Sequence, residues 1–346
     1  MILMSFPLSV LDLVPISSGS TAAQAMRNSI DLARVVDRLG YTRYWFAEHH
    51  NMASVASSVP EVMIGQAVRE TTKLRVGSGG VMLPNHPPLK IAETFRMLEA
   101  LYPGRIDLGI GRAPGTDPLT AYALRRNKDG GHAHEFPEHL SELMAFAADE
   151  FPSDHPFKAV KAMPSDIGFP PLWLLGSSAS GAQLAASLGL GFAFAHHINP
   201  QNALDALRTY QQEFVPSTHL AEPYAILAVA AIVAETPERA EELASSVALA
   251  IVRMRNGQPM PFPSPEEALA YPYTPAERAQ VEAYRRSTQI VGDAQSVRAQ
   301  LDRLVDLTGA NELMIASLIH SHEARVRSYE LLAEAYGLGD GVTPTS

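Results

Sequence analysis

The sequence predicts an α/β protein of the (β/α)8 TIM-barrel class with insertions. Short apolar runs alternate with helical segments along the chain, and eight of these runs have the pattern of strands. The runs are almost continuously apolar, as strands of a parallel sheet covered on both faces are. An open, doubly wound sheet shows the same alternation, but eight repeats favour a closed barrel. Barrels with insertions reach 346 residues, so we expect residues 1–346 to form a single domain.

The first half of the chain supplies four of the expected strands and the helices between them. The helix after the first strand has apolar residues at helical spacing (Met26, Ile30, Ala33 and Val36) and ends at Gly40. The expected strands are residues 6–13, 41–48, 74–83 and 105–111, and the expected helices are 21–39, 59–69 and 89–101.

The second half supplies the other four strands and two irregular segments. The expected strands are 171–176, 191–196, 224–234 and 312–317, and the expected helices are 121–128, 137–150, 179–188, 200–214, 294–307, 323–336 and one capped by Thr236. Residues 151–171 contain several prolines, and we expect an excursion there such as a small hairpin. Residues 256–276 contain six prolines between Pro259 and Pro275, which is typical of a functional lid or of disorder.

Composition excludes several classes of function. The net charge is −10 and the basic residues are scattered, so neither a nucleic-acid surface nor an anionic-membrane surface is expected. No apolar run approaches the roughly 20 residues that a membrane span needs. The absence of cysteine excludes disulfides, thiolate metal sites and a cysteine nucleophile. We therefore expect a cytoplasmic protein.

Polar motifs follow five of the expected strands. They are Glu48-His49-His50, Gly79-Gly80, the stretch GIGRAPG with Arg112, the stretch GSSASG from Gly176 to Gly181, and His196-His197. In a barrel the carboxyl ends of all strands meet at one rim, where active sites of this fold lie. The sequence therefore predicts a functional site built from these five motifs.

The histidines after the second strand favour a catalytic role over a metal site. Successive residues of a strand point to opposite faces, so His49 and His50 cannot both reach one ion while the strand persists. We expect one to face the mouth of the barrel and the other to be held by its neighbours. His132 and His134 have the His-x-His spacing of a metal-dependent barrel hydrolase, but they lie in a glycine-rich loop. No metal is expected.

The turn from Gly176 to Gly181 predicts an anion site. It joins a strand to a helix, and the helix N-terminus offers free N–H groups, to which Ser177, Ser178 and Ser180 add hydroxyls. Simple capping by Ser177 or Ser178 explains the same residues. Arg112 from the fourth strand could add a bidentate charge on a phosphate. GIGRAPG does not fit the GxGxxG fingerprint of dinucleotide sites, because Pro114 stands at the third position.

Taken together, four stretches carry a family resemblance. WFAEHHN, SGGVMLPNHPP, GRIDLGIGRAPGTD and GSSASGAQLAASLGLGFAFA occur in this order, and the chain from about Phe6 to Tyr336 resembles the bacterial luciferase-like flavin-dependent monooxygenases. It is most similar to the single-chain, luciferase-like FMN oxidoreductases.

The resemblance implies reduced FMN at the mouth of the barrel, reacting with O2 through a C4a-peroxyflavin to oxidise a small organic substrate. It implies that His49 is the catalytic histidine, with Glu48 beside it, and that Gly79-Gly80 forms a cis peptide under the isoalloxazine. It also implies a mobile lid at 256–276 and, as in related proteins, a homodimer formed by the helices beside strands two and three. The implied phosphate ligands are Arg112 and Ser178, in the turn that also contains Gly176, Ser177, Ser180 and Gly181, the last standing where a luciferase has Thr.

The sequence leaves the source of electrons and the reaction type open. Without a nicotinamide fingerprint, we expect a separate NAD(P)H:flavin reductase to supply reduced FMN, although direct use of NAD(P)H is an alternative. Phe46, Phe192 and Phe194 point to an apolar substrate or belong to the core. The same residues also allow a deazaflavin-dependent hydride-transfer enzyme of this superfamily, a non-catalytic flavin-binding protein or a metal-dependent hydrolase.

Overall fold

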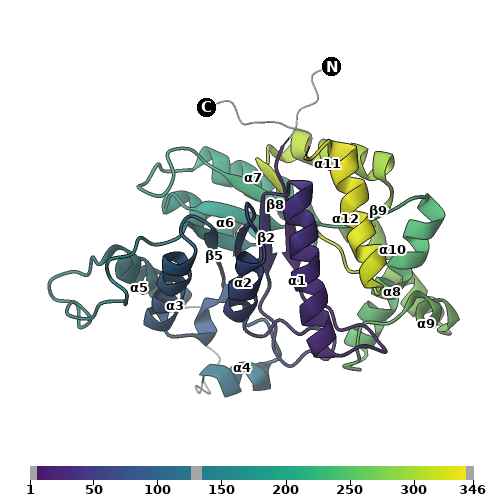
Figure 1. Ribbon diagram of the computed structural model, residues 1–346, viewed down its shortest axis with the longest axis horizontal. Helices are drawn as coiled ribbons and strands as arrows, with labels where there is room; N and C mark the ends of the chain where they lie inside the picture. The colour runs from purple at the N-terminus through teal and green to yellow at the C-terminus, as the bar shows by residue number, and fades with distance from the viewer. Residues whose placement is uncertain (1–5, 126–134, 340–346) are drawn as a thin grey trace.

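The computed structural model describes residues 6–125 and 135–339 of the chain (Figure 1). Within these residues, eight parallel strands form a closed barrel, because the last strand pairs with the first (Leu8↔Leu313). This confirms the predicted (β/α)8 fold. The barrel strands, in order around the wall, are β1 (Leu8–Asp12), β2 (Arg43–Phe46), β3 (Arg75–Ser78), β5 (Ile106–Gly111), β6 (Leu172–Gly176), β7 (Gly191–Ala195), β8 (Ala225–Ala234) and β10 (Glu312–Ala316).

Helices surround the barrel. Thr21 caps the first helix at its N-terminus, and Gly40 ends it in a left-handed conformation, as the sequence predicts. The first and last helices pack against each other on the outside of β1 (Figure 1). The helices are α1 (Ala22–Leu39), α2 (Pro60–Arg69), α3 (Pro88–Leu101), α4 (Pro118–Arg125), α5 (Phe136–Ala148), α6 (Ala179–Ser187), α7 (Ala203–Gln212), α8 (Pro237–Arg255), α11 (Ala294–Thr308) and α12 (His322–Tyr336), with 3-10 turns η1 (Leu83–Asn85) and η2 (Pro200–Asn202).

Three apolar clusters occur among the described residues. The largest lies between the outer face of the barrel and the helices, a second fills the barrel interior, and a third joins the end of β8 to α8 and Phe262. Phe46, Phe192 and Phe194 are fully buried in the outer core. They therefore belong to the packing between barrel and helices, which decides between the two interpretations that the sequence allows for these residues.

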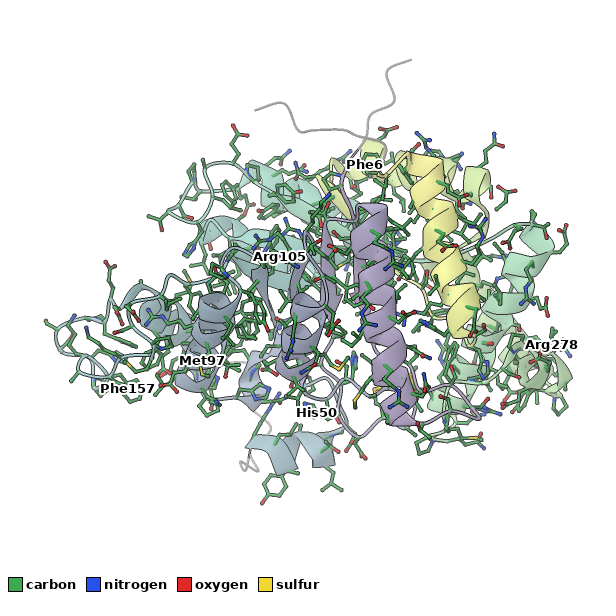
Figure 2. All side chains as sticks on the ribbon, viewed as in Figure 1. Phe6, His50, Met97, Arg105, Phe157 and Arg278 are labelled. Carbon is green, nitrogen blue, oxygen red and sulfur yellow. The ribbon has the colours of Figure 1, made fainter. Side chains whose placement is uncertain are left out.

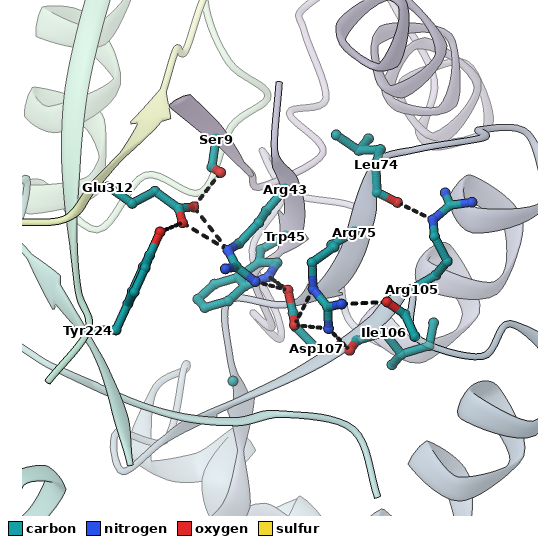
Figure 3. A network of polar contacts seen from close by, with 12 residues as sticks. Ser9, Arg43, Trp45, Leu74, Arg75, Arg105, Ile106, Asp107, Tyr224 and Glu312 are labelled. Carbon is teal, nitrogen blue, oxygen red and sulfur yellow. Dashed lines mark hydrogen bonds and ion pairs between the residues drawn. The ribbon is translucent and has the colours of Figure 1, made fainter. Parts of the chain in front are cut away.

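The barrel interior changes in character from base to mouth. At the base, Arg43 binds Asp107 (2.8 Å) and Glu312 (3.0 Å) in a buried ionic network (Figure 3). One layer higher, the rings of Trp45 and Trp173 meet with their centroids 5.6 Å apart. Inward positions recur every second residue, and towards the mouth most of them carry small side chains. These are Ala47, Gly79, Gly111, Ala195, Ala228 and Ala316, and the larger inward side chains near this level are Leu13 and Leu175. The base is thus filled and the mouth is left open.

The third predicted strand is interrupted, which the sequence does not predict. Residues 74–83 form β3 and a short β4 (Val81–Met82), separated by a cis peptide between Gly79 and Gly80. A Cβ atom on Gly79 would lie 2.6 Å from Cδ1 of Leu11, and one on Gly80 would lie 2.8 Å from the carbonyl oxygen of Gly109. Only glycine therefore fits at these two positions. The cis peptide itself confirms the expectation drawn from the family resemblance.

Three peripheral segments complete the comparison with the predicted elements. An additional strand, β9 (Gln289–Asp293), pairs with the C-terminal half of β8, residues 230–234, and lies outside the barrel. Residues 151–171 form turns and bends without a strand, so the predicted hairpin there is wrong. The last residues of the predicted helix 121–128, together with His132 and His134, lie outside the described residues.

The proline-rich segment 256–276 folds back over the loop that follows β1. It contains α9 (Pro265–Ala270) and leads into α10 (Pro275–Thr288). Phe262 is buried, its N–H donates to the carbonyl of Ile16 (2.8 Å), and its own carbonyl accepts from the N–H of Ser18 (2.7 Å). The segment is therefore ordered against the barrel, while its mobility and the single-domain organisation of residues 1–346 stay predictions. No helix in the described part of the chain has both the length and the apolar character of a membrane span.

Candidate active site

The residues predicted from the sequence meet at the mouth of the barrel. Figure 2 shows the two ends of the barrel. Phe6, which precedes β1, lies at one end, and His50, which follows β2, lies at the other. The registers Phe46↔Ser78 and Ile110↔Leu174 align the carboxyl ends of neighbouring strands. His49, the Gly79-Gly80 peptide, Arg112 and the turn after β6 therefore lie at one rim.

His49 lies on the wall of a cavity at this rim. It continues the inward alternation of Trp45 and Ala47, and it lines a cavity of about 670 Å³. Burial lowers the pKa of His49, the nearby charge of Glu48 opposes this effect, and His50 and His197 add to the lowering. Within the described residues, its Nδ1 has no hydrogen-bond partner. The site thus presents a neutral imidazole at neutral pH.

Glu48 points to the other face of the strand and is completely buried. Its carboxylate accepts hydrogen bonds from the N–H of Met82 (2.8 Å), from Nε2 of His50 (2.8 Å) and from Nε2 of His86 (2.9 Å). Burial acts to raise the pKa of Glu48, but the hydrogen bond and charge of His86, together with the bonds from His50 and Met82, lower it overall. Glu48 is therefore an ionised anchor between β2 and the loop after β4, and it does not line the cavity.

Two further histidines follow β7, which stands across the barrel from β2. Nδ1–H of His197 donates to the carbonyl of Ala228 (3.0 Å), which leaves Nε2 as the free nitrogen, and burial lowers its pKa. Burial lowers the pKa of His196 to about 4. The sequence marks this pair as a polar strand end but assigns it no role. His197 helps to lower the pKa of His49 because the two side chains approach each other across the barrel, and the order of the strands in the sequence does not reveal this.

The turn after β6 has the properties of an anion site. Ser178 is the N-cap residue of α6, yet its side chain makes no capping hydrogen bond and lies 3.1 Å from Oγ of Ser180. The first N–H groups of the helix thus lack side-chain partners. Extending the β5–β6 register places Arg112 beside Gly176, and Arg112 is exposed without a hydrogen bond or ion pair among the described residues. Of the two explanations offered by the sequence, anion binding thus fits Ser178 better than capping does.

The other residues of this turn shape the backbone. The carbonyl of Ser177 accepts a hydrogen bond from Nδ2 of Asn199 (3.0 Å), which fixes the turn against the segment after β7. A Cβ atom on Gly176 would lie 3.2 Å from Cε2 of Phe192, so glycine at this position leaves room for that ring. The serine hydroxyls and the helix N-terminus are thereby held at the rim.

The donors and the free space at the rim fit FMN. A flat ring needs a mouth without bulky side chains, which the layer from Ala47 to Ala316 and the bare Gly79-Gly80 peptide provide. A phosphate needs unpaired donors, which Arg112 and the first turn of α6 provide. These features would accept any flavin-like cofactor with a phosphate at that end.

Most of the cavity lies across the mouth from the turn after β6. Its walls come from the ends of β1, β2 and β10, from residues 115–117 after β5, from α8, from residues 257–262 and from Tyr284. In the strand order, β6 stands across the barrel from β1. Arg112, Ser177 and Ser178 do not belong to the cavity lining, whereas His49 does. The rim therefore has one side with the candidate anion site and another with the cavity.

Comparisons with known proteins agree with this architecture. Residues 6–311 match the family described as luciferase-like monooxygenase. A luciferase-like monooxygenase of Escherichia coli (strain K12) is 45% identical over 93% of this chain and 95% of its own length. An N-acetyl-S-alkylcysteine monooxygenase of Bacillus subtilis (strain 168) is 36% identical over 95% of this chain and 97% of its own. The crystal structure of apo-MsnO8 has a TM-score of 0.89 and 41% identity, covering 96% of this chain and 99% of that chain. The chain belongs to the luciferase-like monooxygenase family.

Proposed function

We propose that this enzyme uses reduced FMN and O2 to oxidise a small, mainly apolar organic substrate. The observation that carries this proposal is the position of His49, whose neutral imidazole lines the cavity at a rim that also carries unpaired phosphate-type donors. Imidazole is suited to general acid–base work because its proton is exchanged near neutral pH. Membership of the family supports the same assignment.

The residues of the rim have distinct proposed roles. Arg112 and the first turn of α6, with Ser178 and Ser180, bind the phosphate of FMN. The Gly79-Gly80 peptide borders the ring without side-chain contact. When bound, reduced flavin supplies the electrons that activate dioxygen. His49 holds or moves one proton at its free nitrogen, and Glu48 contributes by holding the β2 end in place.

The surroundings of the rim support three further parts of the proposal. Residues 256–276 act as a lid that limits water in the cavity, which their contact with Ile16 and Ser18 supports. A separate NAD(P)H:flavin reductase supplies reduced FMN. The enzyme forms a homodimer through α2 and α3, where Val62, Met97 and Leu101 are exposed. A cytoplasmic location stays a prediction.

The relative named N-acetyl-S-alkylcysteine monooxygenase supports the choice of substrate class. An N-acetyl-S-alkylcysteine is a small molecule with an apolar arm, and the cavity of this chain is lined mainly by apolar side chains. We infer that the substrate of this enzyme is likewise a small molecule whose apolar part fills the cavity.

Cofactor titration tests the proposed function. Under anaerobic conditions, we expect reduced FMN to bind and a reduced deazaflavin cofactor to bind at least tenfold more weakly. Arg112→Ala should weaken FMN more than riboflavin, because riboflavin lacks the phosphate that Arg112 contacts. Equal losses for the two flavins would contradict the phosphate assignment. Preferential binding of the deazaflavin would instead favour hydride transfer without O2.

A further inference from the structure

Arg253 brings a positive charge into an apolar cavity. It lies in the last turn of α8, lines the cavity, and has a side chain that is only 14% exposed. Its Nη2 binds Oε2 of Glu267 from α9 (3.1 Å). Its Nη1 is buried and has no hydrogen-bond partner among the described residues. A guanidinium offers five donors, so this side chain retains capacity for a second acceptor.

The rest of the cavity lining does not supply that acceptor. The surrounding wall is apolar and includes Val247, Ile251, Met260, Phe262 and Leu318. Asp117 also lines the cavity, but it is exposed and occupied by other donors. Its carboxylate accepts hydrogen bonds from Asn51 (3.1 Å), from the hydroxyl of Thr120 (2.6 Å) and from the N–H of Leu119 (3.0 Å). Among the described lining residues, histidines aside, Arg253 is thus the cationic group available to a ligand.

We propose that Arg253 binds the carboxylate of the substrate, so that the enzyme acts on a small acid with an apolar arm. This inference rests on the proposed function and narrows its substrate class. Guanidinium matches the planar, bidentate geometry of a carboxylate, and a charge-assisted hydrogen bond is stronger where water is excluded. A cavity of about 670 Å³ accommodates such a molecule with its apolar arm among the remaining lining residues, which include His49.

The position of Arg253 separates this site from the proposed phosphate site. Arg253 lies in the wall formed by α8 and the ends of β1, β2 and β10, whereas Arg112 and Ser178 follow β5 and β6 across the barrel. The two anion-binding groups would therefore serve different molecules.

The test compares octanoate with octanamide, which has the same chain but no charge. We measure their dissociation constants by calorimetry with the full chain. We expect octanoate to bind at least tenfold more tightly than octanamide to the unsubstituted protein. Arg253→Gln should weaken octanoate at least tenfold and change octanamide less than twofold, because only the carboxylate uses the guanidinium.

Two variants serve as controls. Arg255→Gln removes an exposed arginine two residues further along α8 that binds Gln280 outside the cavity, and it should leave both affinities unchanged. Glu267→Gln removes the carboxylate that competes for Arg253, so octanoate should bind about threefold more tightly or better. If Arg253 only held the lid segment through Glu267, both variants would weaken both ligands alike, and that result would overturn the proposal.

Flavin binding distinguishes failure of this inference from failure of the proposed function. Arg253→Gln should leave the affinity for reduced FMN within twofold, whereas a large loss would assign Arg253 to the flavin phosphate. Equal binding of octanoate and octanamide with intact FMN binding would refute only the carboxylate anchor. Failure of the unsubstituted protein to bind reduced FMN would refute the flavin assignment, and the octanoate comparison would still report on Arg253.

Discussion

At the scale of single residues, the alternation of a strand divides the Glu48-His49-His50 motif into two tasks. His49 lines the cavity, while Glu48 lies on the other face and receives hydrogen bonds from His50 and His86. The sequence predicts that one histidine faces the mouth and the other is held by neighbours, and the structure confirms it. It does not predict His86 as a partner, because that contact depends on the interruption of the third strand at Gly79-Gly80.

Replacing His49 tests whether the imidazole that lines the cavity takes part in the reaction. We expect His49→Ala to lower the rate of substrate oxidation by about 10²-fold or more, which is the usual contribution of a positioned acid–base group. The affinity for reduced FMN should change little, because His49 lies away from the proposed phosphate site. The measurement is steady-state oxygen consumption coupled to product formation. His219→Ala, which removes an exposed histidine, is the matched control. A rate within threefold of the unsubstituted enzyme would exclude the proposed role.

At the scale of elements, a buried ion pair joins the first strand to the last helix. Arg325 of α12 binds Asp12 at the end of β1 (2.6 Å), and both side chains are almost completely buried. The N–H of Val14 also donates to Asp12 (2.7 Å), which shapes the turn that leads into the rim. α12 follows β10, the last barrel strand. The pair therefore links the first and last strands, where the barrel wall closes.

Breaking this pair should destabilise the protein strongly. Arg325→Met leaves the Asp12 carboxylate buried without its counter-charge, which costs about 3–5 kcal/mol of unfolding free energy. The double variant Asp12→Asn/Arg325→Met should recover at least half of that loss, because no uncompensated charge remains. Urea unfolding followed by circular dichroism measures both values. Additive losses in the double variant would show that the two side chains act independently.

The sequence predicts those elements whose pattern of apolar and polar side chains lies within one continuous segment of the chain. All eight barrel strands follow from runs such as Tyr224–Ala234, which are apolar on both faces because helices cover one side and the barrel interior the other. The sequence does not predict β9, because its short run Gln289–Asp293 alternates buried and half-buried residues and gains its pairing only from the C-terminal half of β8. Arg253 has the sequence pattern of a basic residue ending a helix, and its burial arises from the fold of residues 257–262 over the cavity.

At the scale of the whole molecule, buried neutral histidines make stability depend on acidity. The pKa of His196 is lowered to about 4 from its ordinary value of 6.5, and the pKa values of His49 and His197 are lowered as well. Above pH 6.5 the folded and unfolded states are both unprotonated at His196, so it contributes no pH dependence. Between pH 6.5 and about 4 the unfolded state binds a proton that the folded state does not.

Stability should therefore fall as the pH is lowered from 6.5 towards 4. One such histidine contributes a slope of up to about 1.4 kcal/mol per pH unit. We expect His196→Gln to reduce the difference in unfolding free energy between pH 6.5 and pH 5, as measured by urea denaturation at the two values. His219→Gln should reduce that difference less, because burial also lowers the pKa of His219 but its side chain is exposed. An unchanged difference in His196→Gln would show that folding does not lower the pKa of this imidazole.

The filled base of the barrel has a consequence for the passage of small molecules. Within the described residues, the network of Arg43, Asp107 and Glu312 and the two tryptophans above it fill the base of the barrel, so small molecules reach the site from the rim. Substrate enters and product leaves through the same rim, which residues 257–262 partly cover. A new substrate molecule can bind only after the product has left, so the rate of product release sets an upper bound on turnover.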